Sequence, residues 1–197
     1  IAYRGQRPIH SHAQGRPHAN AERLFEETLK DVYFAEKAIL KALPKMTKQA
    51  SSEDLKAAFT EHAEQTEGQV ERLDKIFKLL GKKAQGKECP ALKGLVEETE
   101  ELIGEADKGA VLDAGLIGCA QAVEHYEIAR YGTLCAWAEQ LKMDDAVELL
   151  EETLEEEEAT DEKLSELALS GINESADAGK DQDDEDEKPA QRKRKAR

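Results

Sequence analysis

Apolar residues recur every three or four positions along most of the chain, which is the spacing of one face of an α-helix. The pattern forms four long segments and one shorter segment, at about 20–43, 51–80, 90–106, 111–141 and 144–169. No stretch alternates apolar and polar residues as a half-buried strand does. The sequence therefore predicts an all-α protein.

The ends of these segments carry helix start and stop signals. Asn20 has the residue type of an N-cap for the first helix, as has Ser51 or Ser52 for the second. Pro44 is expected to end the first helix, because proline removes a helical hydrogen bond. Gly171 comes just past the last helix, where glycine commonly ends one.

The connections between the long helices indicate how they pack. The first and second helices are joined by a short link, as are the third and fourth, so each pair should be an antiparallel hairpin. Roughly 30 residues separate the two hairpins, and this link contains the short helix at about 90–106. We expect an antiparallel four-helix bundle with one long crossover and a short extra helix.

The charge distribution separates the helical domain from its ends. The chain has 197 residues with 43 acidic and 28 basic side chains, giving a formal charge of -15. Residues 1–19 lack apolar periodicity and are expected to form a flexible arm, and 20–172 to form the domain. Residues 173–197 form an acidic tail with a basic end, Arg192 to Arg197, and are expected to be disordered.

Composition also limits the partners and the compartment. Strong acidity argues against nucleic-acid binding by the domain, which leaves the basic terminal cluster as the one candidate contact. No apolar run approaches the roughly 20 residues that span a bilayer, so no membrane association is expected. The three cysteines show no Cys-x-x-Cys spacing, which favours a reducing cytoplasm.

Several acidic side chains fall on the apolar faces of the long helices. Glu124 and Glu127 are the clearest, because they lie within the most apolar segment of the chain, residues 114–134. A carboxylate that faces a core must be protonated, hydrogen-bonded, paired or metal-bound. At 100° per residue, the inward candidates for metal ligands are Glu36, His62, Glu124, Glu127, Glu157 and Asp161.

These six residues also fall at matched depths in the bundle. Residues equidistant from a hairpin turn lie level in an antiparallel pair. The level pairs are Glu36 with His62, Glu127 with Glu157, and Glu124 with Asp161. Oxygen-rich ligands with one imidazole suit iron or manganese, so the layer is a candidate site for one or two divalent ions.

Some of the inward and neighbouring positions lie in segments that carry a family resemblance. These segments are Leu29–Glu36, Ala42–Met46, His62–Leu73, Gln121–Glu127, Tyr131–Thr133 and Thr153–Asp161. In them the chain resembles the YciE/YciF-like branch of the ferritin-like superfamily, over residues 22–169. The resemblance implies a ferritin-like bundle, a homodimer, a metal-binding role and an association with bacterial stress responses.

The general di-iron carboxylate pattern has Glu on two helices and Glu-x-x-His on the other two. Glu36 matches the first Glu, and Glu124 or Glu127 matches the second. The match is therefore good on the first and third long helices.

The other two helices depart from that pattern. Thr160 stands where His should follow Glu157, and Thr66 and Gln69 replace both ligands on the second helix. His62 lies one turn earlier and is a candidate substitute. The departures argue against a complete ferroxidase ligand set.

Two functions stay open at this point. One is a stress-response protein with an iron or manganese site and undetermined redox chemistry. The other is a structural or interaction homodimer whose degenerate core holds no metal. In the second case the inward acids would be satisfied by tyrosines, Gln69, Gln121, Arg130 or water.

Overall fold

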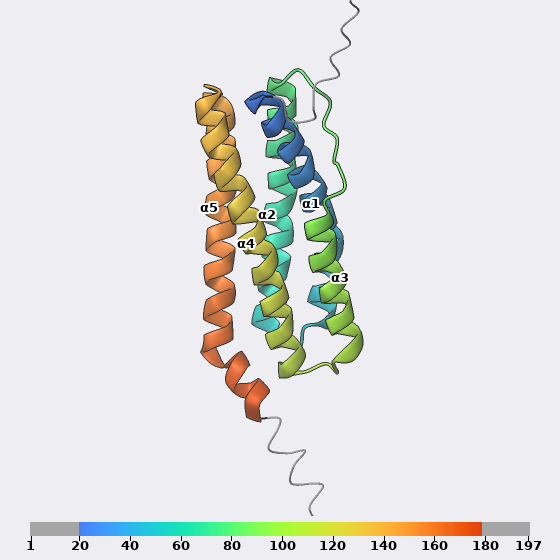
Figure 1. The fold of residues 1–197 in the computed structure, drawn as a ribbon. Coiled ribbons are helices and arrows are strands. Elements are labelled where there is room, and N and C mark those ends of the chain that lie inside the picture. The colour runs from blue at the N-terminus through green and yellow to red at the C-terminus, as the bar shows by residue number, and fades with distance from the viewer. Residues whose placement is uncertain (1–19, 179–197) are drawn as a thin grey trace, which may run out of the picture.

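A computed structural model describes residues 20–178, which contain five α-helices, one π-helical turn and no strand (Figure 1). The helices are α1 (Ala21–Gln49), α2 (Glu53–Leu79), α3 (Pro90–Glu105), α4 (Ala110–Gln140) and α5 (Asp144–Leu167). The expected all-α helical bundle is confirmed. Within the described part of the chain, no helix combines the length and the apolar character needed to cross a membrane.

Two antiparallel hairpins, α1/α2 and α4/α5, form the bundle, and α3 lies outside it against α1 and α4 (Figure 1). The apolar core is divided into two clusters. One contains Ile39 and Leu43 of α1 with Leu116 of α4, and the other contains Leu29 of α1 with Leu134 of α4. Along both helices the polar layer falls between these clusters, at mid-height of the bundle.

The first helix does not end at Pro44, contrary to the sequence prediction, but continues to Gln49. Pro44 is exposed, whereas Leu43 and Met46 beside it are buried in the core. The lost hydrogen bond is therefore on the solvent side, and burial of the following turn offsets the cost of proline.

The turn between α1 and α2 is held by a residue from the second hairpin. The Ser51 and Ser52 amides donate to Asp113 Oδ1 and Oδ2 at 2.7 and 2.8 Å. Ser52 also acts as the N-cap of α2, as expected, because its hydroxyl accepts from the Leu55 amide at 3.3 Å. Asp113 is buried at the start of α4, and its role is not evident from helical periodicity.

The crossover runs from α2 back along α1 before α3 begins (Figure 1). The Lys87 amide donates to the Lys30 carbonyl at 3.0 Å. A Cβ at Gly86 would lie 3.2 Å from Cα and Cβ of Phe34, so glycine permits this close approach. The extra helix then starts at Pro90, as the sequence predicts.

The C-terminal end differs from the expected boundary at 172. After α5 the chain forms the turn η1 (Ala168–Ile172), and residues 173–178 are helical where we expect a disordered tail. Gly171, at a φ of 136°, redirects the chain, and Ile172 packs against the core, so a further helical turn forms. Residues 1–19 and 179–197, which include the rest of the expected arm and tail, lie outside the described residues.

Candidate metal centre

A buried polar layer crosses the bundle between the two apolar clusters. Each residue lies on the core-facing stripe of its helix: Glu36 follows Val32 by one turn, and Glu127 precedes Tyr131 by one turn. The layer consists of Glu36 from α1, His62 from α2, Glu124 and Glu127 from α4 and Glu157 from α5. None of these five residues is more than 3% exposed.

Four of the five residues converge closely enough to share one ion. One ligand atom from each of His62, Glu124, Glu127 and Glu157 lies within 4.8 Å of the others. Ligands bound at about 2.0–2.2 Å are separated by roughly 3–4.4 Å across a metal ion. Within this group, His62 Nε2 lies 3.2 Å from Glu124 Oε1.

The layer leaves most of its polar atoms without a hydrogen-bond partner. Among residues 20–178, nine buried side-chain nitrogen or oxygen atoms lack a partner, and eight of them belong to this layer. They include both ring nitrogens of His62 and all four carboxyl oxygens of Glu127 and Glu157. Buried polar groups are normally satisfied, so these atoms fit a site that a cation would complete.

Within the layer, Glu36 is the carboxylate that accepts a hydrogen bond from a tyrosine. The Tyr131 hydroxyl donates to Glu36 Oε1, while Glu36 Oε2 has no partner. Burial, followed by the nearby Glu36, raises the pKa of Tyr131 well above its usual value, so this tyrosine remains a donor. The contact fixes one oxygen of Glu36 and leaves the other free.

Burial also changes the protonation of the carboxyls. Loss of hydration, with repulsion between neighbouring acids, raises the pKa of Glu36 and Glu127 well above the ordinary value of 4.5. The pKa of Glu157 is raised in the same way, and burial raises that of Glu124 to about 7. Without a cation, burial therefore favours the protonated forms of these groups, whereas a bound cation favours their charged forms.

The structure does not bring Asp161 into this cluster. Its carboxylate accepts from Gln121 Nε2 at 3.1 Å and lies 3.2 Å from His125 Nε2. The side chain of Asp161 is 22% exposed, since it lies one turn beyond Glu157 near the surface His125. Asp161 thus already has partners on α4.

The positions that depart from the di-iron pattern are occupied by residues with other contacts. Thr66 donates to the His62 carbonyl at 2.7 Å, and Thr160 donates to Gln65 Oε1 at 3.4 Å. Gln69 Nε2 donates to a Glu156 oxygen at 3.2 Å. From α2, only His62 contributes to the close cluster.

Most of the side chains named as alternative partners for the acids point elsewhere. Tyr33 interacts with Asp74, and the Arg130 guanidinium lies 5.1 Å from the centre of the Tyr126 ring. Gln121 binds Asp161. Among the tyrosines in residues 20–178, Tyr131 is the one whose hydroxyl reaches the layer.

A second polar cluster surrounds the buried Arg72 and is not evident from the sequence pattern. Arg72 Nε donates to Thr153 Oγ1 at 2.8 Å and Nη1 to Glu152 Oε1 at 2.9 Å. Nη2 contacts Glu156, so all three guanidinium nitrogens have partners on α5. The available signal was the position of Arg72 three residues after Gln69, on the edge of the α2 stripe.

With this geometry established, the chain can be compared with known proteins. Residues 20–177 match the family described as "Domain of unknown function (DUF892)". Protein YciF of Escherichia coli strain K12 is 47% identical over 157 residues, covering 79% of this chain and 95% of YciF.

Solved structures show the same architecture. The crystal structure of the E. coli stress protein YciF has a TM-score of 0.75 at 47% identity, covering 78% of this chain and 98% of that one. YcfI from Rhodopseudomonas palustris, provisionally called a structural protein, has a TM-score of 0.72 at 54% identity, covering 74% and 93%. A Xanthomonas campestris pv. campestris protein has a TM-score of 0.65, with coverage of 81% and 98%, but at 22% identity it supports the fold alone.

Proposed function

This chain belongs to the DUF892 family and is YciF-like, and from that premise we propose that it is a ferritin-like stress protein with a divalent metal site. The metal is iron or manganese, held in the buried layer between the two apolar clusters. The observation that carries the proposal is the set of eight buried, unpartnered ligand atoms in that layer. The E. coli relative is described as a stress protein, and we extend that role to this chain.

The ligands fall into two groups. His62, Glu124, Glu127 and Glu157 would hold the first ion, because their ligand atoms already converge. Glu36 has one oxygen without a partner and would help to hold the same ion or a second one. One imidazole and several carboxylates form a donor set that suits iron and manganese.

The protein's own residues determine what such a site can do. A bound iron or manganese ion would supply Lewis-acid or electron-transfer chemistry. Tyr131 fixes one Glu36 oxygen, and the apolar clusters on both sides exclude bulk water from the layer. The carboxyls must release protons when a cation binds, so affinity rises with pH.

Titration of Mn²⁺ into metal-free protein at pH 7.5, followed by calorimetry, tests the proposal. We expect about one equivalent or more to bind, and affinity to fall by roughly 100-fold in Glu127→Gln and in Glu157→Gln, since each loses a direct ligand. Asp161→Asn is the matched control on α5 and should bind as the unchanged chain does. Less than a tenth of an equivalent bound, with ferrous iron as well as Mn²⁺, would contradict the proposal.

A structural role without metal is the second candidate, favoured by the raised carboxyl pKa values. Neutral, protonated carboxyls can remain buried without a cation. If the role is structural, Mn²⁺ should leave the melting temperature of the protein unchanged. If the metal site exists, Mn²⁺ at 100 times the Kd of the unchanged chain should add about 2.7 kcal/mol to its free energy of unfolding. The same Mn²⁺ concentration should add only about 0.4 kcal/mol in Glu127→Gln, because its affinity is roughly 100-fold weaker.

A further inference from the structure

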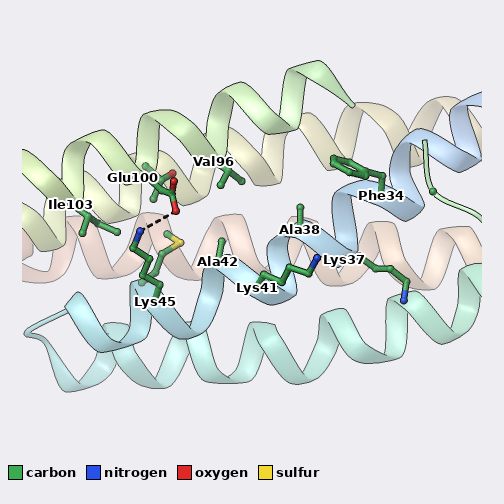
Figure 2. A pocket seen from close by; sticks show the side chains of 12 residues that line it. Phe34, Lys37, Ala38, Lys41, Ala42, Lys45, Val96, Glu100 and Ile103 are labelled. Atoms are coloured by element: carbon green, nitrogen blue, oxygen red, sulfur yellow. Dashed lines mark hydrogen bonds and ion pairs between the residues drawn. The ribbon is translucent and has the colours of Figure 1, made fainter. Parts of the chain in front are cut away.

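A groove between α1 and α3 runs along the outside of the bundle (Figure 2). Its volume is about 360 Å³. Apolar side chains from both helices form most of its surface, among them Phe34, Ala38, Ala42, Val96 and Ile103.

Next to this groove is a much smaller, inner cavity among α1, α2, α3 and α4, with which it shares lining residues. It offers about 20 Å³ to the centre of a water-sized molecule, where one such molecule needs roughly 10–15 Å³. The two spaces share the side chains of Ala42, Met46, Val96 and Thr99, so these four residues border both of them.

The inner cavity ends at the buried polar layer. His62 and Glu124 form part of its lining, although the other lining residues are largely apolar. His62 and Glu124 are 3% and 1% exposed, and both carry buried atoms without a hydrogen-bond partner. The cavity therefore leads from an outer groove to unpartnered atoms of the candidate metal centre.

The positive charge at the outer groove argues against entry of cations by this route. Lys37, Lys41 and Lys45 follow each other at one-turn intervals along the α1 side (Figure 2). Lys45 pairs with Glu100 at 3.0 Å, but Lys41 has no ion pair with any residue from 20 to 178. A divalent cation would be repelled at the groove and would then lose its hydration among apolar walls.

The polarity of the connection excludes polar solutes as well. The Thr99 hydroxyl already donates to the Leu95 carbonyl at 2.9 Å, and the other three shared side chains are apolar. A hydrated or strongly hydrogen-bonding molecule would thus lose partners on the way in. A small apolar molecule would not.

We propose that the α1/α3 groove and the inner cavity form an entry passage for a small uncharged molecule, of the size of a dissolved gas, to the His62 and Glu124 side of the layer. The use of that molecule rests on the proposed metal function, whereas the passage itself does not need the metal. Ala42 and Val96 control its width, because both line the groove and the cavity.

Dissolved dioxygen, used as a paramagnetic probe of methyl relaxation by NMR, tests the passage in metal-free protein. Ile39 and Leu43 line the cavity at 4% and 3% exposure. Leu73 and Ile76, at 1% and 0% exposure in the other apolar cluster, are the matched controls. We expect the relaxation enhancement by dioxygen to be at least several-fold greater at the cavity methyls than at the control methyls. Equal enhancement at both sets of methyls would overturn the proposal. This includes the case in which a second copy of the chain covers the groove and keeps dioxygen from Ile39.

Paired variants locate the route. Ala42→Leu should narrow the passage and reduce the Ile39 enhancement to the control level, whereas Ala38→Leu, which touches the groove alone, should leave it. Val96→Ala should widen the passage and increase the enhancement, so the test does not depend on Ala42→Leu folding. An Ile39 enhancement unchanged in both Ala42→Leu and Val96→Ala would overturn the route.

Mn²⁺ titration separates this inference from the proposed function. Mn²⁺ affinity should be the same in Ala42→Leu and in the unchanged chain, because Ala42 is not a metal ligand and equilibrium affinity does not depend on the entry route. Normal Mn²⁺ binding with no selective dioxygen enhancement overturns the passage alone. Selective enhancement without Mn²⁺ binding supports the passage and overturns the metal function.

Discussion

Two polar regions, each centred on buried side chains, connect α2 to α5, and they are built in opposite ways. Around Arg72, every guanidinium nitrogen has an acceptor on α5. Around His62 and Glu157, ligand atoms converge without donors. Glu156 belongs to the first region and Glu157, the next residue, to the second. Burial of charge alone therefore does not mark a functional site; unsatisfied burial is the informative observation.

The largest effect should come from breaking the satisfied region. Arg72→Leu removes the partner of Glu152 and Glu156 and of Thr153, and we expect a loss of about 3 kcal/mol in the free energy of unfolding. Urea melts with and without Mn²⁺ measure it. The loss should be equal in both conditions, since the Arg72 region has no part in metal binding. A loss confined to the metal-loaded protein would mean that the two regions are one unit.

The unsatisfied region should give the next largest effect, through pH. Its carboxyl pKa values lie above 4.5 in the folded state, with Glu124 at about 7, so the folded protein binds more protons than the unfolded chain between these values. The stability that these protonated carboxyls contribute is fully present below pH 4.5 and is lost as pH rises through 7. In metal-free protein, the free energy of unfolding should fall by on the order of 2 kcal/mol from pH 5.5 to 8.

Urea melts across this pH range check the prediction. The slope should flatten in a Glu127→Gln/Glu157→Gln double variant and persist in Arg72→Leu. A slope that is the same in the double variant as in the unchanged chain would assign it to the general negative charge of the protein instead.

A smaller effect is expected where the unsatisfied region has its one donor. Tyr131→Phe removes the hydrogen bond to Glu36 and should cost about 1 kcal/mol. It should also weaken Mn²⁺ binding by about 10-fold, because Tyr131 orients a ligand without being one. Calorimetry of Tyr131→Phe and of the unchanged chain measures the stability loss and the Mn²⁺ affinity separately. Equal Mn²⁺ affinity in the two proteins would make the role of Tyr131 purely structural.

The smallest effect should come from an ion pair that belongs to neither region. Lys163 and Glu61 join α5 to α2 at the surface, with side chains 43% and 57% exposed. Lys163→Ala should change the free energy of unfolding by less than about 0.5 kcal/mol, because water screens such pairs. A larger change would mean that contacts between α2 and α5 stabilise the bundle irrespective of burial.

Helical periodicity predicted much of this arrangement because both regions lie on regular helices. Glu36, His62, Glu127 and Glu157 occupy stripe positions, and a stripe position is buried in almost any packing of a bundle. Glu124 lies to one side of its stripe by angle, and its complete burial depends on how α4 packs in the bundle.

Features that depend on tertiary contacts were beyond the sequence. Asp161 fits the inward angle, but Gln121 and His125 on α4 provide its contacts. Pro44 carries a strong stop signal, yet burial of Met46 extends the helix past it. Arg72 needed its three partners on α5 to be known before its burial made sense. Metal binding itself stays a prediction.

The contact of Asp113 with the Ser51 and Ser52 amides has a consequence for how the chain becomes a unit. The turn of the first hairpin is held by the Asp113 carboxylate, which belongs to the second hairpin, so neither hairpin is complete alone. A chain cleaved in the crossover between 81 and 89 should therefore give two fragments that recover native helicity only when mixed. The long crossover would then serve to raise the effective concentration of two obligate halves rather than to specify how they fit.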